Sequence, residues 1–354
     1  MKQKVLLAMS GGVDSSVAAI ILQEQGYEVI GATMKLWEDK SITDGCCALS
    51  AINDAKKVCD ILNIEHLVFD VTKEFKECVI DDFVTRYEEI KTPNPCIECN
   101  KNIKFSYFYK KAKELGIEYI ATGHYAKTCF DEKYNRYVLK KSKSLRKDQS
   151  YVLYNIPKEV VSKIIFPLGD FVDKDEIREI AKKHGLDIAN KPDSQEICFI
   201  PDNNHEKFLL NNMKKKPKEG NVVNTKGEIL GRHKGLMFHT IGQRKGLGIS
   251  SKTPLYIIKL DAKKNEVVVG TEEETYSTAL YANELNYILF DDINEPVTIK
   301  AKVRYSINET EGVLYKVEED KVKVEFKTPV RAITPGQSVV FYIDDVVLGG
   351  GKIL

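Results

Sequence analysis

The feature that most constrains this chain is a serine- and glycine-rich stretch close to its start, residues 9–16 (MSGGVDSS). It follows the apolar run 5–8 and leads into the apolar segment 17–22. An apolar run, a glycine pair and a Ser/Asp-rich helix start predict a strand, a loop and a helix. Such a loop turns backbone N–H groups and the positive end of a helix toward an anion. We therefore expect a phosphate site, with Asp14 or Ser15 capping the helix and serine hydroxyls donating to phosphate oxygens.

The first 200 residues alternate between predicted strands and helices. Strands are expected at 4–9, 28–34, 65–71 and 118–122, and helices at about 15–25, 47–62, 74–90, 101–115 and 173–185. This alternation is typical of an α/β fold with a doubly wound parallel sheet covered on both faces. Ligands of such folds bind at the carboxyl ends of the strands, where the serine-rich loop would lie.

The pattern changes after about residue 205. Lys214–Lys218 is expected to be a linker or exposed loop, and a glycine-studded basic segment follows at 231–248. Short β-like runs then dominate, at 256–258, 267–269, 297–299, 321–326 and 339–343, which favours a small barrel or sandwich. We predict a catalytic domain at 1–204, a small basic central domain at 205–272 and a C-terminal β-barrel at 273–354.

Charge is unevenly distributed, although the net charge is only +1. Residues 133–147 contain Lys and Arg but no acid, and residues 207–245 contain only Glu219 and Glu228 as acids. Local basic stretches suit a partner such as RNA bound along one face. A solvated lysine-rich surface explains the same pattern equally well.

Cysteine use depends on the compartment. No apolar run approaches the roughly 20 residues of a membrane span, and Ser10 ends the first apolar run too early for a signal peptide. A cytoplasmic protein is expected, in which the 8 cysteines are thiols rather than a disulfide framework. Some of these are interpreted as core residues: Cys46, Cys47, Cys59, Cys78 and Cys129.

Two other cysteine segments indicate chemistry. In residues 92–100 (TPNPCIECN), Pro93 and Pro95 predict an extended loop, with a helix beginning near Asn100 or Asn102. A thiol near a helix N-terminus beside lysines has its thiolate favoured. The second segment is 193–200 (DSQEICFI). A zinc site would usually need a second CxxC pair, and the adjacent thiols of Cys46 and Cys47 are a poor substitute for one. A thioredoxin-like redox pair would open a helix, whereas here prolines precede the pair in an expected loop.

The serine-rich loop is not a Walker A loop, because no Lys-Ser/Thr follows the glycines at the required spacing. It resembles the SGGxDS signature of the PP-loop ATP pyrophosphatases. That family cleaves ATP between the α- and β-phosphates, adenylates its substrate and releases pyrophosphate.

Further motifs make the resemblance specific. Together with SGGVDSS at 10–16, the chain contains TPNPCIECN at 92–100, ATGHYA at 121–126, KDQSYVL at 147–153, DSQEICFI at 193–200 and TIGQRKGLGI at 240–249. This combination is similar to the tRNA-specific 2-thiouridylases, the MnmA/TrmU family, over essentially the whole chain. The resemblance implies that ATP and Mg²⁺ adenylate the C2 oxygen of a wobble uridine, and that sulfur then replaces this oxygen.

The resemblance also implies site residues. Asp14 belongs to the catalytic set. Cys198 corresponds to the persulfide-carrying cysteine and Cys99 to the nucleophile that forms a disulfide with it as sulfur leaves. Two thiols suit this chemistry, because one delivers sulfur and the other resolves the persulfide. The residues implied to bind ATP are Ala8, Met9, Ser10, Gly11, Gly12, Val13, Asp14 and Ser15, with Met34 and Gly123 close to the adenosine.

Partners follow from the same resemblance. They are wobble-uridine tRNAs, those for Lys, Glu and Gln, and a sulfur donor such as a cysteine desulfurase or a sulfur-relay protein. The target uridine is expected to flip into a pocket, which costs little because it is already unpaired in the anticodon loop. The residues implied to contact tRNA are Asn94, Pro95, Cys96, His124, Lys147, Asp148, Gln149, Arg304, Tyr305 and Gln337.

Cys96 departs from the family pattern, in which many members carry aspartate. Cys96, Cys99 and Cys198 could therefore ligate three irons of a [4Fe–4S] cluster whose fourth iron binds sulfide. Cys96 could equally be an extra thiol. Two rival functions also remain: another PP-loop enzyme that adenylates a small molecule, which would not require both Cys99 and Cys198, and a nucleotide- or RNA-binding module without catalysis.

Overall fold

The computed structural model describes residues 2–37, 49–187, 197–200 and 203–354. The chain forms two compact units, which are described separately. The first contains residues 1–80, 95–204 and 345–347, and the second contains 81–94, 205–344 and 348–354.

The first unit is built on a parallel sheet, as predicted. Its centre is β1, whose residues Val5, Leu6 and Leu7 are fully buried. Apolar runs that are buried on both faces are typical of parallel strands covered by helices. The strand order is β3-β2-β1-β4-β7, and every neighbouring pair is parallel. The strands are β1 (Lys4–Ala8), β2 (Glu28–Lys35), β3 (Glu65–Asp70), β4 (Tyr119–Thr122) and β7 (Ile164–Ile165).

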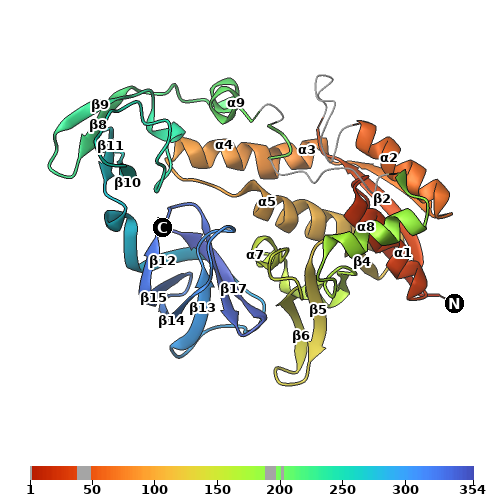
Figure 1. Ribbon diagram of the computed structural model, residues 1–354. Helices are drawn as coiled ribbons and strands as arrows, with labels where there is room; N and C mark the ends of the chain where they lie inside the picture. The colour runs from red at the N-terminus through yellow and green to blue at the C-terminus, as the bar shows by residue number, and fades with distance from the viewer. Residues whose placement is uncertain (1, 38–48, 188–196, 201–202) are drawn as a thin grey trace. The chain divides into compact units, whose positions relative to one another are not determined.

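This order places a topological switch point between β1 and β4. The chain runs outward from β1 to β2 and β3 and then returns to β4 on the other side of β1. Right-handed crossovers therefore put the two sets of connecting helices on opposite faces of the sheet. The helical elements of this unit, several of which are labelled in Figure 1, are α1 (Val13–Glu24), α2 (Leu49–Ile61), α3 (Thr72–Phe75), η1 (Lys76–Ile80), α5 (Pro95–Glu98), η2 (Cys99–Tyr107), α6 (Phe108–Glu114), α7 (Ser150–Leu153), η3 (Lys158–Lys163) and α8 (Lys174–Lys183).

One predicted helix starts earlier than expected. The sequence placed a loop before a start near Asn100 or Asn102, but helical structure begins at Pro95 and continues through α5, η2 and α6. Proline suits the first helical position, because its fixed φ is helical and its missing N–H would have no partner there. Cys96 and Cys99 consequently lie in the first turns of the helix. A thioredoxin-like CxxC pair was set aside because such a pair opens a helix, whereas this pair was expected in a loop. The pair does lie at the start of a helix, so that reason was wrong.

A β-hairpin in the first unit was not predicted. It joins β5 (Ala126–Asp131) to β6 (Arg136–Lys141) in antiparallel register. Cys129 lies on it and is exposed, so its interpretation as a core residue was wrong, and Cys78 is only half-buried. Cys59 is fully buried, as predicted, and burial together with Asp60 raises its pKa to about 12.

The second unit contains a four-stranded sheet of order β10-β11-β8-β9 and a closed antiparallel barrel of β12–β17. The barrel closes because β12 pairs with both β15 and β17. Closure leaves no exposed edge, and it confirms the predicted C-terminal β-barrel. The elements are α4 (Asp81–Glu88), α9 (His205–Asn212), β8 (Gly220–Asn224), β9 (Ile229–His233), η5 (Leu236–Phe238), β10 (Tyr256–Asp261), β11 (Glu266–Gly270), η6 (Glu273–Thr275), β12 (Tyr276–Tyr287), β13 (Val297–Lys302), β14 (Thr310–Glu318), β15 (Lys321–Arg331), β16 (Ser338–Ile343) and β17 (Val346–Ile353).

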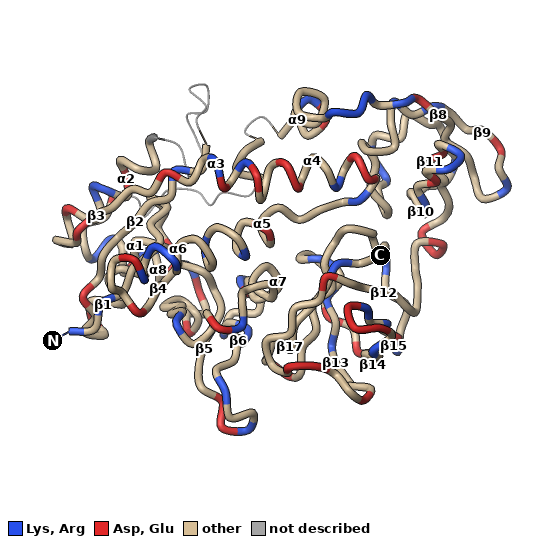
Figure 2. Tube along the Cα trace, turned by 180° about the vertical axis from the view of Figure 1, so that it is seen from behind, with Lys and Arg blue, Asp and Glu red and all other residues tan. Residues whose placement is uncertain are grey.

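The predicted basic linker lies between α9 and β8. Lys214–Lys218 forms neither helix nor strand, and Figure 2 shows the tube there in blue over much of its length. Nothing in the described part of the chain is a helix with the length and apolar character needed to cross a bilayer.

Candidate active site

The serine-rich loop lies at the carboxyl end of β1, beside the switch point. Its backbone is fixed at the start, where the Met9 N–H donates to Ala32 O at 2.8 Å. Gly11 adopts φ +67°, and a Cβ there would come within 2.5 Å of Ala51 O. Glycine is therefore required at this position by both backbone conformation and space. The loop has the geometry expected of a phosphate-binding turn, with α1 starting directly after it.

The start of α1 differs in detail from the prediction. The N-cap is Gly12 and makes no side-chain capping bond, so neither Asp14 nor Ser15 caps the helix. The reason is that α1 begins at Val13, which puts both residues inside its first turn. Ser15 Oγ instead donates to Gly12 O at 3.1 Å and accepts from the Ser10 N–H at 3.2 Å.

Asp14 is held by two side chains that the sequence analysis missed. Tyr125 Oη donates to Asp14 Oδ1 at 2.9 Å, and Lys174 Nζ lies 3.3 Å from Asp14 Oδ2. The side chain of Lys174 is only 9% exposed, so its charge is compensated by this ion pair. Tyr125 lies in the ATGHYA motif, but nothing in the sequence indicated which carboxylate it contacts.

The other residues expected near ATP lie at the same edge of the sheet. Ala8 ends β1, Met34 is close to the end of β2, and Gly123 directly follows β4. A Cβ on Gly123 would come within 2.9 Å of Asp14 C and Ser15 N. The loop after β4 therefore packs directly against the first turn of α1. The structure brings these residues together at the place where doubly wound folds bind their ligands.

The helix that carries Cys99 is connected to this edge through polar contacts. Asn100 Nδ2 donates to Val152 O at 2.9 Å in α7. Ahead of α7, Gln149 exchanges two bonds with Tyr125, since its Oε1 accepts from the Tyr125 N–H and its own N–H donates to Tyr125 O, both at 2.9 Å. Tyr125 in turn contacts Asp14. Hydrogen bonds and α7 thus connect the Asp14 carboxylate to Asn100, the residue that follows Cys99.

Cys198 lies in a short turn closed by the Ile200 N–H, which donates to Ile197 O at 2.9 Å. The turn is anchored by Phe199, whose ring centroid is 5.9 Å from that of Phe75 in α3. Cys198 is half-buried, Cys99 is buried and Cys96 is exposed.

These three thiols are not gathered as a metal-binding group. Within the described residues, no three or more His, Cys, Asp or Glu side chains come together in a way that could hold a metal ion. The alternative role of Cys96, Cys99 and Cys198 as ligands of a [4Fe–4S] cluster stays a prediction.

His124, just after β4, packs against Phe105 and Phe166, whose ring centroids are themselves 6.0 Å apart. Its ring centroid is 6.0 Å from that of Phe105 and 6.2 Å from that of Phe166, and its Nδ1 lies 2.7 Å from Thr122 Oγ1. Burial, and secondarily the charge of Lys104, hold the pKa of His124 well below its ordinary value. The imidazole is therefore neutral at physiological pH.

Two of the residues expected to contact tRNA use their side chains internally. Asp148 accepts from the Ser142 N–H at 2.9 Å and from Ser150 Oγ at 2.6 Å, and Gln149 binds Tyr125 as described. Lys147 lines an open cleft. The role of all three toward tRNA stays a prediction.

The remaining tRNA candidates, apart from Pro95 and Cys96 in α5, belong to the second unit. Gln337 Nε2 donates to Thr92 O at 2.8 Å, two residues before Asn94. Arg304 donates to Ile241 O at 2.8 Å and also to Thr334. Tyr305 is exposed. Gln337 and Arg304 therefore fix the local structure around them, and their contact with tRNA stays a prediction.

Some sequence predictions concern residues outside the described part of the chain. These are Cys46 and Cys47, and residues 193–196 of the segment that leads to Cys198.

Comparison with known proteins covers nearly the whole chain. Residues 3–202 match the tRNA methyl transferase HUP domain, 206–271 the tRNA methyl transferase PRC-barrel domain, and 277–353 the aminomethyltransferase beta-barrel domain. The tRNA-specific 2-thiouridylase MnmA of Acetivibrio thermocellus is 51% identical over 99% of both chains. That of Clostridioides difficile is 49% identical over 100% of this chain and 98% of its own.

A solved 4-thiouridine synthetase–RNA complex with bound ATP is similar over 56% of this chain and 45% of its own. Its sequence identity is 21% and its TM-score 0.38. A superposition this partial does not assign a function.

The packing of Gly123 gives the first prediction. Gly123→Ala should push the β4 loop away from the first turn of α1 and weaken ATP binding at least about tenfold, equivalent to about 1.4 kcal/mol. Isothermal titration with ATP measures this change. Gly116→Ala is the control for backbone strain alone, because φ there is +70° but a Cβ meets nothing within 4 Å, and it should leave ATP affinity unchanged. Equal ATP affinity in the two variants would contradict the proposed close approach.

The low pKa of His124 gives the second prediction. Below the ordinary pKa of about 6.5, histidine is protonated in the unfolded chain, whereas His124 stays neutral in the folded chain. The unfolded state then binds more protons, so the free energy of unfolding falls as the pH falls. Between pH 7 and pH 5, the natural protein should lose up to about 2 kcal/mol more than His124→Gln. Urea unfolding at both pH values measures the difference, and equal losses would show that His124 titrates normally.

Proposed function

The chain belongs to the MnmA family of tRNA-specific 2-thiouridylases, and from this premise we propose that it converts a wobble uridine of tRNA to 2-thiouridine with ATP. The observation that carries the proposal is end-to-end identity of about half with proteins of that name. A small-molecule adenylating enzyme would share the loop at Ser10 but would have no reason to match the family through the barrel to residue 353.

We propose that adenylation takes place at the carboxyl edge of the sheet. The phosphates of ATP lie on residues 8–15, with Met34 and Gly123 beside the adenosine. Asp14, fixed by Tyr125, would hold Mg²⁺, which neutralises phosphate charge when bound. The uracil O2 attacks the α-phosphorus, and pyrophosphate leaves with the electron pair of the broken P–O bond. The reaction turns O2 into part of a good leaving group, AMP.

Sulfur transfer is proposed to use Cys198 and Cys99. A donor loads Cys198 as a persulfide, whose outer sulfur attacks C2 and displaces AMP. The thiolate of Cys99 then attacks Sγ of Cys198, which breaks the S–S bond and leaves sulfur on the base. The resulting Cys99–Cys198 disulfide requires a thiol reductant before the next turnover. The connection from Asn100 through α7 and Tyr125 to Asp14 supports a role for Cys99 beside the adenylation site.

The partners are proposed on the same basis. They are the tRNAs for Lys, Glu and Gln, and a persulfide donor of the desulfurase or relay class, acting in the cytoplasm. The RNA contacts proposed in the first unit are Pro95, Cys96, His124, Lys147, Asp148 and Gln149, and those in the second unit are Asn94, Arg304, Tyr305 and Gln337.

The third prediction tests the persulfide cysteine. Cys198→Ser should abolish formation of 2-thiouridine, because a hydroxyl cannot carry the sulfane sulfur. Binding of ATP and tRNA should remain within about twofold, since the turn is anchored by Phe199 rather than by the thiol. Nucleoside mass spectrometry and filter binding measure the two properties. Cys129→Ser, on the exposed hairpin, is the matched control and should be fully active; full activity of Cys198→Ser would remove the basis of the assignment.

The fourth prediction separates the two sulfur mechanisms. Cys96→Ser should retain thiolation within a few-fold, because Cys96 is an exposed thiol in the first helical turn with no step of its own in the persulfide route. The assay supplies either a persulfide or plain sulfide to anaerobically purified protein. Loss of activity in Cys96→Ser, together with loss of a brown chromophore, would instead establish the cluster route.

A further inference from the structure

A cleft of about 530 Å³ opens in the first unit beside the serine-rich loop. One wall is the loop after β6, residues 143–147, and the other is the start of α8 with Val172 and Asp173 before it. The charged residues that line it are Lys143, Arg146, Lys147, Asp173, Lys174 and Arg178. Five of these six are basic, so the cleft favours an anion.

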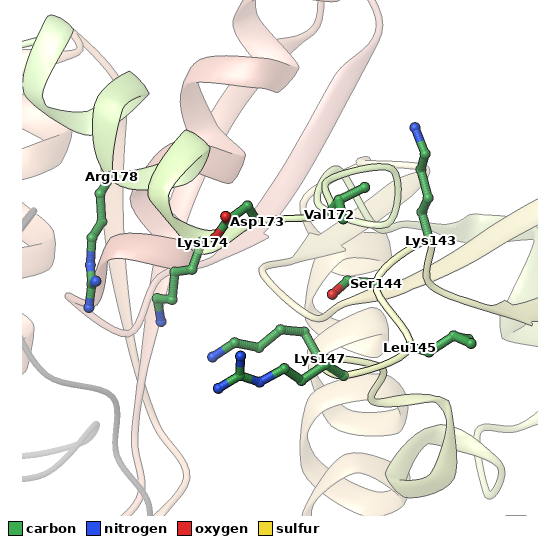
Figure 3. A pocket seen from close by; sticks show the side chains of 9 residues that line it. Lys143, Ser144, Leu145, Lys147, Val172, Asp173, Lys174 and Arg178 are labelled. Atoms are coloured by element: carbon green, nitrogen blue, oxygen red, sulfur yellow. The ribbon is translucent and has the colours of Figure 1, made fainter.

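The basic side chains converge from both walls. Figure 3 shows Lys147 reaching from its loop toward the space that Lys174 and Arg178 enter from α8, whereas Lys143 and Leu145 point away. The single carboxylate, Asp173, accepts a bond from the Asp175 N–H at 3.1 Å and so caps α8. Two of these cations already have a carboxylate partner, since Lys174 pairs with Asp14 and Arg178 Nη1 lies 3.7 Å from Asp175 Oδ1. A multiply charged anion in the cleft would replace these carboxylates as the partner of both cations.

Lys174 connects the cleft to the adenylation site. Its ammonium lies 3.3 Å from Asp14 Oδ2, in the first turn of α1 directly after the phosphate loop. An anion held by Lys174 would therefore lie next to the phosphates of ATP. A highly charged small anion suits the site better than a single RNA phosphodiester, because several cations face one space.

We propose that this cleft receives the pyrophosphate that ATP loses during adenylation, with Lys174 passing from Asp14 to the departing phosphates. This inference rests on the proposed function. As the bond between the α-phosphorus and its bridging oxygen breaks, the electron pair and the negative charge go to pyrophosphate. Lys174 and Arg178 stabilise that charge and draw the leaving group away from the reaction centre.

Arg178 is the residue on which to test the inference. Its side chain is 37% exposed, so replacing it should not unfold α8. Unlike Lys174, it makes no ion pair with Asp14 beside the serine-rich loop. Arg178→Gln removes the charge and Arg178→Lys keeps it. Lys183→Gln is the matched control, because it removes one exposed charge from the last turn of the same helix without lining the cleft.

The experiment measures the affinity of the full chain for inorganic pyrophosphate, AMP and tRNA in separate titrations. Arg178→Gln should weaken pyrophosphate binding about tenfold, while Arg178→Lys recovers part of the loss. AMP, which lacks the β- and γ-phosphates, and tRNA should bind all variants within about twofold. Lys183→Gln should match the natural protein throughout.

Unchanged pyrophosphate affinity in Arg178→Gln would overturn the inference, and so would a loss of tRNA affinity without loss of pyrophosphate affinity, which would assign the cleft to the RNA backbone. The proposed function fails separately: a protein that binds pyrophosphate through Arg178 but forms no 2-thiouridine contradicts the function, not the cleft. If the natural protein thiolates tRNA but Arg178→Gln binds pyrophosphate equally well, only the proposed role of the cleft is contradicted.

Discussion

The candidate site depends on the close approach of two chain segments at the switch point of the parallel sheet. One is the loop that leads into α1, and the other is the turn after β4, where a Cβ on Gly123 would clash with the backbone of Asp14 and Ser15. The strand order β3-β2-β1-β4-β7 creates this meeting point, because β2 and β3 are added on one side of β1 and β4 and β7 on the other. Once the two segments touch, Tyr125 can bind Asp14, and Gln149 can bind Tyr125. The topology of this one sheet thus positions the serine-rich loop, the Asp14 carboxylate and the helix that carries Cys99.

Much of this arrangement could be predicted from the sequence. Apolar runs identified β1 to β4, although β3 proves to be only partly buried, and the glycine pair identified the loop. Apolar pattern and glycine conformation are local properties, which is why they could be recognised. The helix at Pro95 was placed too late, since prolines were taken as extending the chain when one of them opens a helix. Lys174 could not have been found, because its contact with Asp14 joins residues 160 positions apart. Contacts of that kind come from packing rather than from local pattern.

The structure also changes the interpretation of several polar residues. Asp148, Gln149, Arg304 and Gln337 make internal hydrogen bonds that fix loops, which sequence similarity alone would describe only as RNA contacts. In a sequence comparison, residues that position a binding surface look the same as residues that touch the ligand, because both roles require a particular side chain. Lys147 and Arg178 differ from them, because they face an open cleft. Hydrogen bonds to loop backbone thus identify side chains that build the site, whereas Lys147 and Arg178 line a space that a ligand can enter.

The central claim is that ATP activates O2 of the target uridine so that sulfur can replace it. The most direct test uses an anticodon stem-loop whose target uridine carries ¹⁸O at position 2, incubated with the protein, ATP, Mg²⁺ and a persulfide. The account predicts that the label appears in the phosphate of AMP while the base gains sulfur. Unlabelled AMP, or a label that stays in the RNA, would contradict it, because ATP would then have reacted with water or with another group.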